Sequence, residues 1–238
     1  MKYALVGHGR MGRAVDAAAA ARGHVRALVV SRSGRGRGVA RSIEAAAWRG
    51  VGVAFEFTHA DAALDNVLAL LARGIPVVCG STGWDASDPR LGRAARASRA
   101  GAVLAPNFSI AMNLFYALVE QAARRFGALD AFDPWIAEWH HRAKRDAPSG
   151  TARRLAAILG PGVPVAAVRA GHEPGRHVVG FDGPDDLVTL SHAARGRSGF
   201  ATGAVVAAEW LRGRRGLHAF DEVIEDLVRR PRRKGGRR

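Results

Sequence analysis

Two imidazoles and an ammonium group lie within five residues of this 238-residue chain, at His140, His141 and Lys144. An imidazole can hold or release a proton near neutral pH. A partly buried lysine can act as an acid, which the permanently charged arginine cannot. These residue types at this spacing predict a catalytic site that exchanges protons with a small molecule.

The residues that follow this cluster predict an anion site. Pro148 and Ser149 precede a helix expected to begin near Thr151, and the free N–H groups of a helix start attract a carboxylate or a phosphate. Of the 36 basic residues only three are lysines, and two of those lie near the chain ends. The internal lysine, Lys144, therefore fits a site that needs a compact, titratable cation.

The first residues carry a dinucleotide-binding pattern. The turn from Gly7 to Gly12 matches G-x-G-x-x-G between an apolar run and an Ala-rich segment. The first glycine allows the tight turn, the second lets the backbone approach a pyrophosphate, and the third lets helix and strand pack closely. This context predicts a cofactor site whose contacts are Gly7, His8, Gly9, Arg10, Met11 and Gly12.

The residues after the second expected strand indicate which dinucleotide binds. An NAD site usually carries an acid at this position, whereas this chain has Ser31-Arg32-Ser33-Gly34-Arg35. Arg32, with Arg35 or Arg37, can pair with a 2′-phosphate, although a solvated loop explains Arg35 and Arg37 nearly as well. The expected cofactor is NADPH, with NADH as the alternative.

Two later loops are expected at the same edge of the sheet, Gly80-Ser81-Thr82-Gly83 and Ala105-Pro106-Asn107-Phe108-Ser109. Ligands of open α/β sheets bind at the carboxyl ends of the strands. Backbone and hydroxyl groups in these loops can therefore hold the nicotinamide and its ribose. Asn107 and Ser109 are also typical helix-capping residues, and both interpretations can hold together.

Strands and helices alternate in the first half of the chain, which predicts a doubly wound parallel sheet, an α/β fold of the Rossmann type. Strands are expected at 2–6, 25–30, 51–57, 75–79 and 102–105, and helices at 11–22, 39–48, 60–73 and 89–100. In the second half, helices are expected at 111–126, 151–159 and 203–211, and strands at 134–139, 165–169, 177–181 and 187–193. This half predicts an α+β domain with a mixed or antiparallel sheet.

The composition is that of a soluble, globular chain, with 48% hydrophobic residues and no apolar run that reaches the ~18 residues of a membrane helix. The single Cys79 fits the reducing cytoplasm. The net charge is +15, but seven of the last ten residues, 229–238, are Arg or Lys, which leaves +8. This basic tail is expected to be disordered and to bind polyanions weakly, without specific recognition of nucleic acid.

With the cofactor turn, several motifs make the chain resemble the bacterial 4-hydroxy-tetrahydrodipicolinate reductase (dihydrodipicolinate reductase) family over residues 1–225. The most specific is His-His-x-x-Lys-x-Asp-Ala-Pro-Ser-Gly-Thr, from His140 to Thr151. The other motifs are Gly80-Ser81-Thr82-Gly83, Asn107-Phe108-Ser109, Arg169-x-Gly171-His172-Glu173-Pro174-Gly175-x-His177 and Phe200-Ala201-x-Gly203-Ala204.

The resemblance implies an NAD(P)H-dependent reduction of 4-hydroxy-tetrahydrodipicolinate in diaminopimelate and lysine biosynthesis. It implies that His140 donates or accepts a proton and that Lys144 donates one. The implied contacts of the two substrate carboxylates are His141, Lys144, Gly150 and Thr151. The implied contacts of the dinucleotide are residues 7–12, Arg32, Gly80, Ser81, Thr82, Ala105, Pro106, Asn107 and Phe108.

The resemblance also implies how the chain is divided and assembled. Residues 1–108 would form the cofactor domain, to which 213–228 returns, and residues 109–212 the domain for substrate binding and oligomerisation. A cytoplasmic homotetramer is the implied assembly. The chain departs from the family pattern at Glu56, where Asp is frequent, at Ser81, where Thr is frequent, and in a short segment between the second and third strands.

Other interpretations are weighed against this one. A metal site is not expected, because neighbours on an extended segment point to opposite faces and no acid or cysteine has ligand spacing. His172 and His177 are expected to shape a turn between strands, and Arg197 to serve packing or a hinge. The alternative functions are a related dehydrogenase of another amino or imino dicarboxylate, and a non-enzyme that senses dinucleotides or binds polyanions.

Overall fold

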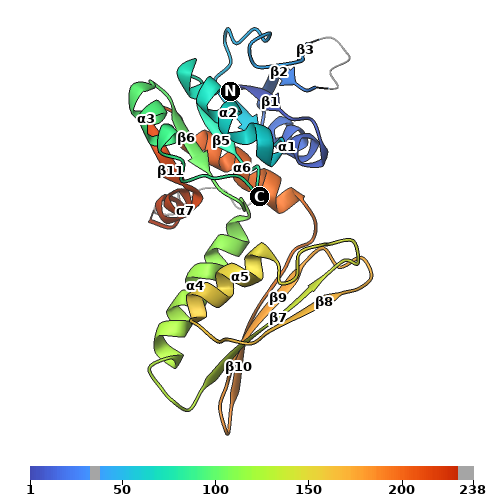
Figure 1. Ribbon diagram of the computed structural model, residues 1–238, viewed down its shortest axis with the longest axis vertical. Helices are drawn as coiled ribbons and strands as arrows, with labels where there is room; N and C mark the ends of the chain where they lie inside the picture. Colours follow the sequence, from blue (N-terminus) through green and yellow to red (C-terminus); the bar gives the residue numbers. More distant parts are fainter. Residues whose placement is uncertain (33–37, 230–238) are drawn as a thin grey trace, which may run out of the picture. The chain divides into compact units, whose positions relative to one another are not determined.

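The computed structural model describes residues 1–32 and 38–229 of the chain. The chain divides into two compact units: unit 1 combines Met1–Ser109 with the segment from Phe200, and unit 2 is Ile110–Gly199. Unit 1 is therefore discontinuous in sequence, and it contains both ends of the colour scale in Figure 1. The basic tail predicted to be disordered lies, apart from Arg229, outside the described residues.

Unit 1 is built on a seven-stranded sheet in the order β11-β6-β5-β4-β1-β2-β3, in which all neighbours run parallel (Figure 1). Its strands are β1 (Lys2–Val6), β2 (Val25–Val30), β3 (Val39–Ala40), β4 (Val53–Glu56), β5 (Val77–Cys79), β6 (Gly101–Leu104) and β11 (Gly216–Ala219). Its helices are α1 (Arg10–Ala21), α2 (Ala60–Ala72), α3 (Pro89–Ala97), α6 (Ser198–Trp210) and α7 (Phe220–Arg229). The predicted doubly wound parallel sheet is confirmed.

Continuous apolar runs explain why the central strands form this sheet. All residues of β4 and β5 are buried, as are the last four of β1. A parallel strand that is covered on both faces needs such a run, because neither side of the strand meets water. Helices α1 and α2 contribute buried small and aliphatic residues to the core, among them Ala19, Val67 and Leu71.

The prediction of a helix over residues 39–48 is wrong. The segment begins with the short edge strand β3, which pairs with β2, and continues as a series of turns. The Ser42 hydroxyl accepts a hydrogen bond from Ala45 N (3.3 Å), and the Trp48 indole N–H donates to Ile43 O (2.8 Å). Bonds from side chains to the backbone compete with the helical ladder, and pairing with β2 satisfies the backbone of the strand instead.

Unit 2 contains a four-stranded sheet in the order β10-β9-β7-β8 (Figure 1). Its strands are β7 (Asp133–His140), β8 (Val165–Arg169), β9 (Arg176–Asp182) and β10 (Leu187–Ala193), and its helices are α4 (Ile110–Phe126) and α5 (Gly150–Leu159). β9 runs antiparallel to β7 and β10, whereas β8 runs parallel to β7. The mixed sheet predicted from the sequence is confirmed.

Helices α4 and α5 pack on one face of this sheet. The shared core consists of Met112, Phe115, Tyr116, Val119, Ile136, Ala152, Leu155, Val179 and Phe181. On the strands, Val168, Leu187 and Val188 remain exposed to solvent. Within the two described stretches of the chain, no helix combines the length and the apolar character needed to cross a membrane.

The chain returns to unit 1 earlier than the sequence-based division places it. That division ended the second domain at residue 212, whereas the structural boundary falls between Gly199 and Phe200. Most of α6 therefore belongs to unit 1, followed by β11, which pairs with β6. Gly203 on α6 permits this packing, because an added Cβ would lie only 1.7 Å from Phe108 O.

We expect Gly203→Ala to destabilise unit 1 by about 3 kcal/mol, since the methyl group forces α6 away from the backbone at Phe108. Gly199→Ala on the same helix is the matched control, because nothing lies within 4 Å of a Cβ added there. Its expected effect is a gain of about 0.5–1 kcal/mol in helix stability. Urea unfolding of both variants measures the difference, and equal stabilities would contradict the close packing.

Candidate active site

The glycine-rich turn between β1 and α1 has the close contacts that its sequence predicts. Gly7 has a φ of +93°, and an added Cβ would lie 2.4 Å from Phe57 O. A Cβ at Gly12 would lie 2.2 Å from Gly7 O, whereas one at Gly9 would meet no atom of the described residues within 4 Å. Two of the glycines thus let backbone segments touch, and Gly9 leaves room for a ligand.

Helix α1 begins directly after this turn and offers its first N–H groups to an anion. Gly9 is its N-cap, no side chain in the described part of the chain bonds this end of the helix, and its first turn contains no acid. Arg10 is exposed, while His8 and Met11 are half-buried. A helix start of this kind fits the pyrophosphate of a dinucleotide, because its free N–H groups and the helix dipole both favour negative charge.

The end of β2 carries a cation where an NAD site usually has an acid. Arg32 follows the strand by two residues and is exposed. An exposed guanidinium at this position can pair with a 2′-phosphate. Arg35 and Arg37, the other two cations considered for this role, lie outside the described residues.

The loop after β5 contains a buried polar atom that a ligand can satisfy. Ser81 is 8% exposed, and its Oγ has no hydrogen-bond partner among the described residues. Gly80 precedes it and lies against the Phe57 ring, where an added Cβ would be 2.1 Å from Cε1. Thr82, which follows, is exposed. Since β1, β4 and β5 are parallel neighbours, this loop shares a sheet edge with the glycine-rich turn.

The loop after β6 reaches the same edge, but one of its predicted contacts is a core residue. Asn107 Oδ1 accepts a hydrogen bond from Ser109 N (2.8 Å) just before α4. The Phe108 ring is buried, with its centroid 6.2 Å from that of Phe57 and 4.9 Å from that of Phe220. Its side chain therefore packs rather than facing a ligand. The remaining predicted contacts in this loop are Ala105, which is buried, and Pro106, which is exposed.

A buried carboxylate at this edge was not among the predicted site residues. Glu56, at the end of β4, is fully buried and accepts hydrogen bonds from the Thr58 hydroxyl, Thr58 N (3.2 Å) and Asn66 Nδ2 (3.2 Å). Its other oxygen accepts from the Cys79 thiol (3.1 Å). Burial and this carboxylate raise the pKa of Cys79, so the thiol stays protonated. Glu56 thus ties the ends of β4 and β5 together.

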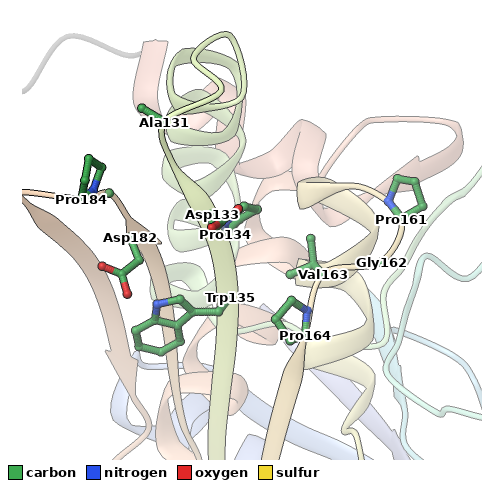
Figure 2. A pocket seen from close by; sticks show the side chains of 11 residues that line it. Ala131, Asp133, Pro134, Trp135, Pro161, Gly162, Val163, Pro164, Asp182 and Pro184 are labelled. Atoms are coloured by element: carbon green, nitrogen blue, oxygen red, sulfur yellow. The ribbon is translucent and has the colours of Figure 1, made fainter.

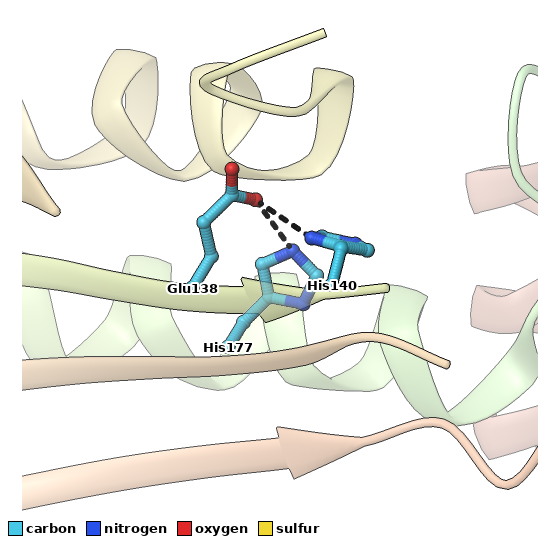
Figure 3. Close-up of side chains that lie close together, drawn as sticks. All are labelled: Glu138, His140 and His177. Carbon is cyan, nitrogen blue, oxygen red and sulfur yellow. Dashed lines mark ion pairs between the residues drawn. The ribbon is translucent and has the colours of Figure 1, made fainter. Parts of the chain in front are cut away.

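In unit 2, Glu138, His140 and His177 form a buried cluster (Figure 3). Glu138 and His140 are two residues apart on β7 and so share a face of the sheet, and His177 on β9 pairs directly with Glu138. Glu138 Oε2 lies 3.5 Å from His140 Nδ1 and 3.3 Å from His177 Nε2. The two imidazoles meet edge to face, with centroids 5.1 Å apart.

The other oxygen of Glu138 is held by the surrounding scaffold. Oε1 accepts hydrogen bonds from Arg169 Nη2 (2.6 Å) and from Ser149 N (2.9 Å). Ser149 also caps α5, because its Oγ accepts a bond from Ala152 N (3.1 Å). The helix begins at Gly150, one residue before the predicted start, so Gly150 and Thr151 both lie in its first turn, Gly150 exposed and Thr151 half-buried.

Burial and charge set the protonation states of this cluster. Burial, followed by the neighbouring His140, lowers the pKa of His177 to about 4. Burial also lowers the pKa of His140, as do Lys144 and Arg169, while Glu138 acts in the opposite direction. For Glu138 burial favours the acid form, but bonds from Ser149 and Arg169 bring its pKa below the usual range. At neutral pH the carboxylate is therefore ionised and His177 is uncharged.

Lys144 lies in the loop after β7, half-buried and paired with an acid. Its Nζ donates to Asp146 Oδ1 (2.7 Å), and this bond lowers the pKa of Asp146. Arg169 Nη2 donates to Asp146 O (2.6 Å), which ties the loop to β8. His141 is half-buried next to the cluster. Unit 2 thus brings His140, His141, Lys144 and the start of α5 into one region.

Sequence reasoning missed Glu138, Arg169 and His177. The expectation that His177 shapes a turn is wrong, because His177 lies within β9, whereas His172 does lie in the turn before it. One available signal was the spacing of Glu138 and His140, which puts an acid on the same strand face as a candidate catalytic histidine. The contact between Glu138 and His177 depends on the register of β7 and β9, which no local sequence pattern reveals.

The cluster also has the composition of a metal site, since donor atoms of Glu138, His140 and His177 lie within 4.8 Å of one another. However, Arg169 already pairs with this carboxylate at 2.6 Å, and Lys144 is near enough to lower the pKa of His140. A divalent cation would add positive charge beside these two cations. The arrangement therefore suits proton exchange better than cation binding.

A cavity of about 850 Å³ lies in unit 2, and Figure 2 shows the residues that line it. Its lining includes Asp133, Trp135 and Asp182 together with four prolines, and none of the predicted site residues. Trp135 is five residues before His140 on β7, which corresponds to about 17 Å along a strand. Its charged groups are carboxylates, so this cavity is unsuited to an anionic substrate.

Together, a parallel sheet with a glycine-rich turn and a second sheet with a carboxylate–imidazole cluster beside a lysine define a pyridine-nucleotide-dependent oxidoreductase. The family model described as "Dihydrodipicolinate reductase, N-terminus" matches residues 1–108, and "Dihydrodipicolinate reductase, C-terminus" matches residues 111–224. The chain belongs to the dihydrodipicolinate reductase family.

Individual relatives agree with this assignment. The 4-hydroxy-tetrahydrodipicolinate reductase of Christiangramia forsetii is 31% identical over 245 residues, 96% of this chain and 100% of that protein. The enzyme of the same name from Chromobacterium violaceum is 36% identical over 217 residues, 80% of each chain. The dipicolinate-bound dihydrodipicolinate reductase from Paenisporosarcina sp. TG-14 has the same fold, with a TM-score of 0.78, 22% identity and coverage of 92% of this chain and 97% of that one.

These findings confirm the predicted family and activity: an NAD(P)H-dependent reductase of 4-hydroxy-tetrahydrodipicolinate in diaminopimelate and lysine biosynthesis. The alternatives considered from the sequence, a related dehydrogenase and a non-enzyme, are not needed to explain the chain.

The buried, uncharged state of His177 predicts how unit 2 responds to acid. Its pKa is about 4 in the folded chain, while an unfolded histidine titrates near 6.5, so the unfolded state binds the extra proton as pH falls through this window. Between pH 7 and pH 5 the chain should lose about 2 kcal/mol of unfolding free energy through this residue.

Urea unfolding of the chain and of His177→Gln at both pH values measures this contribution. Between pH 7 and pH 5 the unfolding free energy of the variant should fall by about 2 kcal/mol less than that of the unmodified chain, because glutamine does not titrate. The same pH dependence in both proteins would show that His177 is protonated equally in the folded and unfolded states.

Proposed function

We propose that His140 and Lys144 supply the proton for the reduction of 4-hydroxy-tetrahydrodipicolinate and that residues around them hold the two substrate carboxylates. The observation that supports this most is the arrangement in unit 2, where a histidine backed by a buried carboxylate and a half-buried lysine lie beside a helix start. Proton donors and anion-binding groups are thereby combined on one small region of the chain.

The reduction requires both a proton donor and groups that bind the substrate carboxylates. When bound, the reduced nicotinamide supplies a hydride to the unsaturated ring, and the electron density left on the ring must be neutralised by a proton. His140 or Lys144 provides this proton, and the cationic surroundings stabilise the charge as it develops. His141, Lys144, Gly150 and Thr151 orient the ring through its carboxylates, with the N–H groups at the start of α5 as donors.

A dicarboxylate suits these residues by charge. Lys144 and Arg169 are cationic, and the first turn of α5 contains no acid. Asp146 pairs with Lys144, so a substrate carboxylate would compete with it for the ammonium. The relative from Paenisporosarcina is described as bound to dipicolinate, a dicarboxylate of related shape, which supports the same ligand class here.

For the cofactor we propose NADPH in preference to NADH. Gly7, His8, Gly9, Arg10, Met11 and Gly12 would hold the pyrophosphate, and Arg32 the 2′-phosphate. Gly80, Ser81, Thr82, Ala105, Pro106 and Asn107 would surround the nicotinamide side, and Phe108, whose ring is buried, would contribute only its backbone. The supporting observations are the uncapped start of α1, the exposed cation after β2 and the unpartnered buried hydroxyl of Ser81.

We further propose that unit 1 carries the dinucleotide and unit 2 the substrate, in a cytoplasmic homotetramer assembled through unit 2. The exposed Val168, Leu187 and Val188 on the sheet of unit 2 support an oligomer, since exposed apolar side chains on a sheet favour association. The single, buried Cys79 is compatible with the reducing cytoplasm.

Replacement of Lys144 tests the proton donor. Lys144→Arg keeps the positive charge but removes the titratable acid, so kcat should fall by about 100-fold or more while NADPH binding stays unchanged. The assay follows absorbance at 340 nm with the product of dihydrodipicolinate synthase as substrate. Lys2→Arg, the same exchange at an exposed position of unit 1, is the control. Nearly full activity of Lys144→Arg would exclude the acid role.

Replacement of Arg32 tests the choice of cofactor. Arg32→Ala should raise KM for NADPH by about tenfold, the loss of a charge-assisted hydrogen bond, and leave KM for NADH unchanged. Arg49→Ala, at another exposed arginine of unit 1, should alter neither value. Equal effects of Arg32→Ala on both cofactors would show that this guanidinium does not recognise the 2′-phosphate.

A further inference from the structure

The Glu138 carboxylate is held in one orientation by groups that take no part in the proposed proton transfer. Ser149 N and Arg169 Nη2 donate to Oε1 at 2.9 and 2.6 Å. A carboxylate anchored through one oxygen cannot rotate freely, so Oε2 stays directed at the two imidazoles, 3.5 Å from His140 Nδ1 and 3.3 Å from His177 Nε2 (Figure 3).

The surroundings of His177 indicate where its proton lies. Its Nδ1 is buried without a hydrogen-bond partner among the described residues, whereas Nε2 faces Glu138 Oε2 and the Ser149 hydroxyl. A buried N–H without an acceptor costs more than a bare ring nitrogen, so the proton belongs on Nε2. His177 is then an uncharged donor that bonds the Ser149 hydroxyl at 3.3 Å and lies 3.3 Å from Glu138 Oε2.

The two ring nitrogens of His140 have different environments. Nδ1 is buried 3.5 Å from Glu138 Oε2, and although the two atoms form no hydrogen bond in this geometry, the negative charge of the carboxylate favours a proton on this nitrogen. Nε2 lies beside Gly175, where an added Cβ would come within 3.0 Å of it. Gly175 thus leaves space at Nε2 that any side chain would fill. The carboxylate selects the Nδ1–H tautomer, and Nε2 is the atom left for proton exchange.

We propose that Glu138 and His177 are positioning residues: Glu138 fixes the orientation and tautomer of His140, and His177 fixes Glu138. This inference rests on the proposed role of His140 in proton transfer. It parallels the general logic in which a buried carboxylate orients a catalytic imidazole and stabilises its charged form.

The charged groups around His140 define the expected pH dependence. Glu138 on β7 and Asp146 in the following loop favour the imidazolium, while Lys144, Arg169 on β8 and burial oppose it. His177 on β9 is uncharged at neutral pH. Removal of the Glu138 charge should therefore lower the pKa of His140. If protonated His140 is needed, the decline of kcat at high pH should move down by about one pH unit.

The test combines kinetics with a measurement that does not depend on turnover. In protein labelled with ¹⁵N-histidine, ¹H–¹⁵N correlation spectra report which ring nitrogen of each histidine carries the proton. The unmodified chain should show the Nδ1–H form of His140, and Glu138→Gln should show a mixture of tautomers. Glu138→Gln should also lower kcat by about 100-fold, with KM for NADPH unchanged.

A pair of His177 variants covers the case in which Glu138→Gln fails to fold. Glutamine can place an N–H donor near the position of imidazole Nε2, so His177→Gln should retain most activity and the His140 tautomer. His177→Leu cannot donate, and should lower kcat by about tenfold and mix the tautomers. His24→Gln, in unit 1, where the ring bonds Glu209, is the control and should change neither.

The outcomes separate the proposals. Variants that are less stable but keep the tautomer, the pH profile and kcat would overturn the positioning role and leave a purely structural one. An inactive unmodified chain would contradict the proposed function, and yet its His140 spectrum would still report whether Glu138 sets the tautomer. If His177→Gln were no more active than His177→Leu, and Glu138→Gln left the His140 tautomer unchanged, His177 would be excluded as the support of the carboxylate.

Discussion

The structure of unit 2 depends on one buried, ionised carboxylate. Removing a carboxylate from water is costly unless hydrogen bonds and opposite charge replace its hydration. For Glu138 these replacements come from different elements: Arg169 at the end of β8, Ser149 at the start of α5 and His177 on β9. The cost is offset only when all of these elements are in place, so the geometry around His140 is a condition of the folded state of unit 2.

The cofactor site proposed for unit 1 would work in the opposite way. Its glycine-rich turn works through the absence of side chains, because Gly7 and Gly12 let backbone segments touch and Gly9 leaves open space before an uncapped helix. No buried cation is needed, since N–H groups and the helix dipole attract the anion. A phosphate site of this kind depends on backbone geometry, whereas the substrate region proposed in unit 2 depends on the protonation of particular side chains.

Local patterns predicted much of this molecule. The turn over 7–12, the segment from His140 to Thr151 and most strands were evident because each is determined by neighbouring residues. The prediction of a helix over 39–48 was wrong, because hydrogen bonds within turns and pairing with β2 outweigh the helix propensity of the alanines in this segment. The partnership of Glu138 with His177 could not be predicted, because it depends on strand register. The boundary within the second half differed because α6 packs on a part of the chain about ninety residues earlier.

The discontinuity of unit 1 has a consequence for how the chain matures on the ribosome. Unit 2 is one uninterrupted stretch, Ile110–Gly199, so all its strands have been translated before β11 and α7 are made. Until β11 is made, one edge of β6 in the seven-stranded sheet has no neighbour, and open strand edges recruit other chains. Synthesis from the N-terminus therefore allows unit 2 to complete its fold first. The seven-stranded sheet of unit 1 needs protection while more than a hundred further residues are translated.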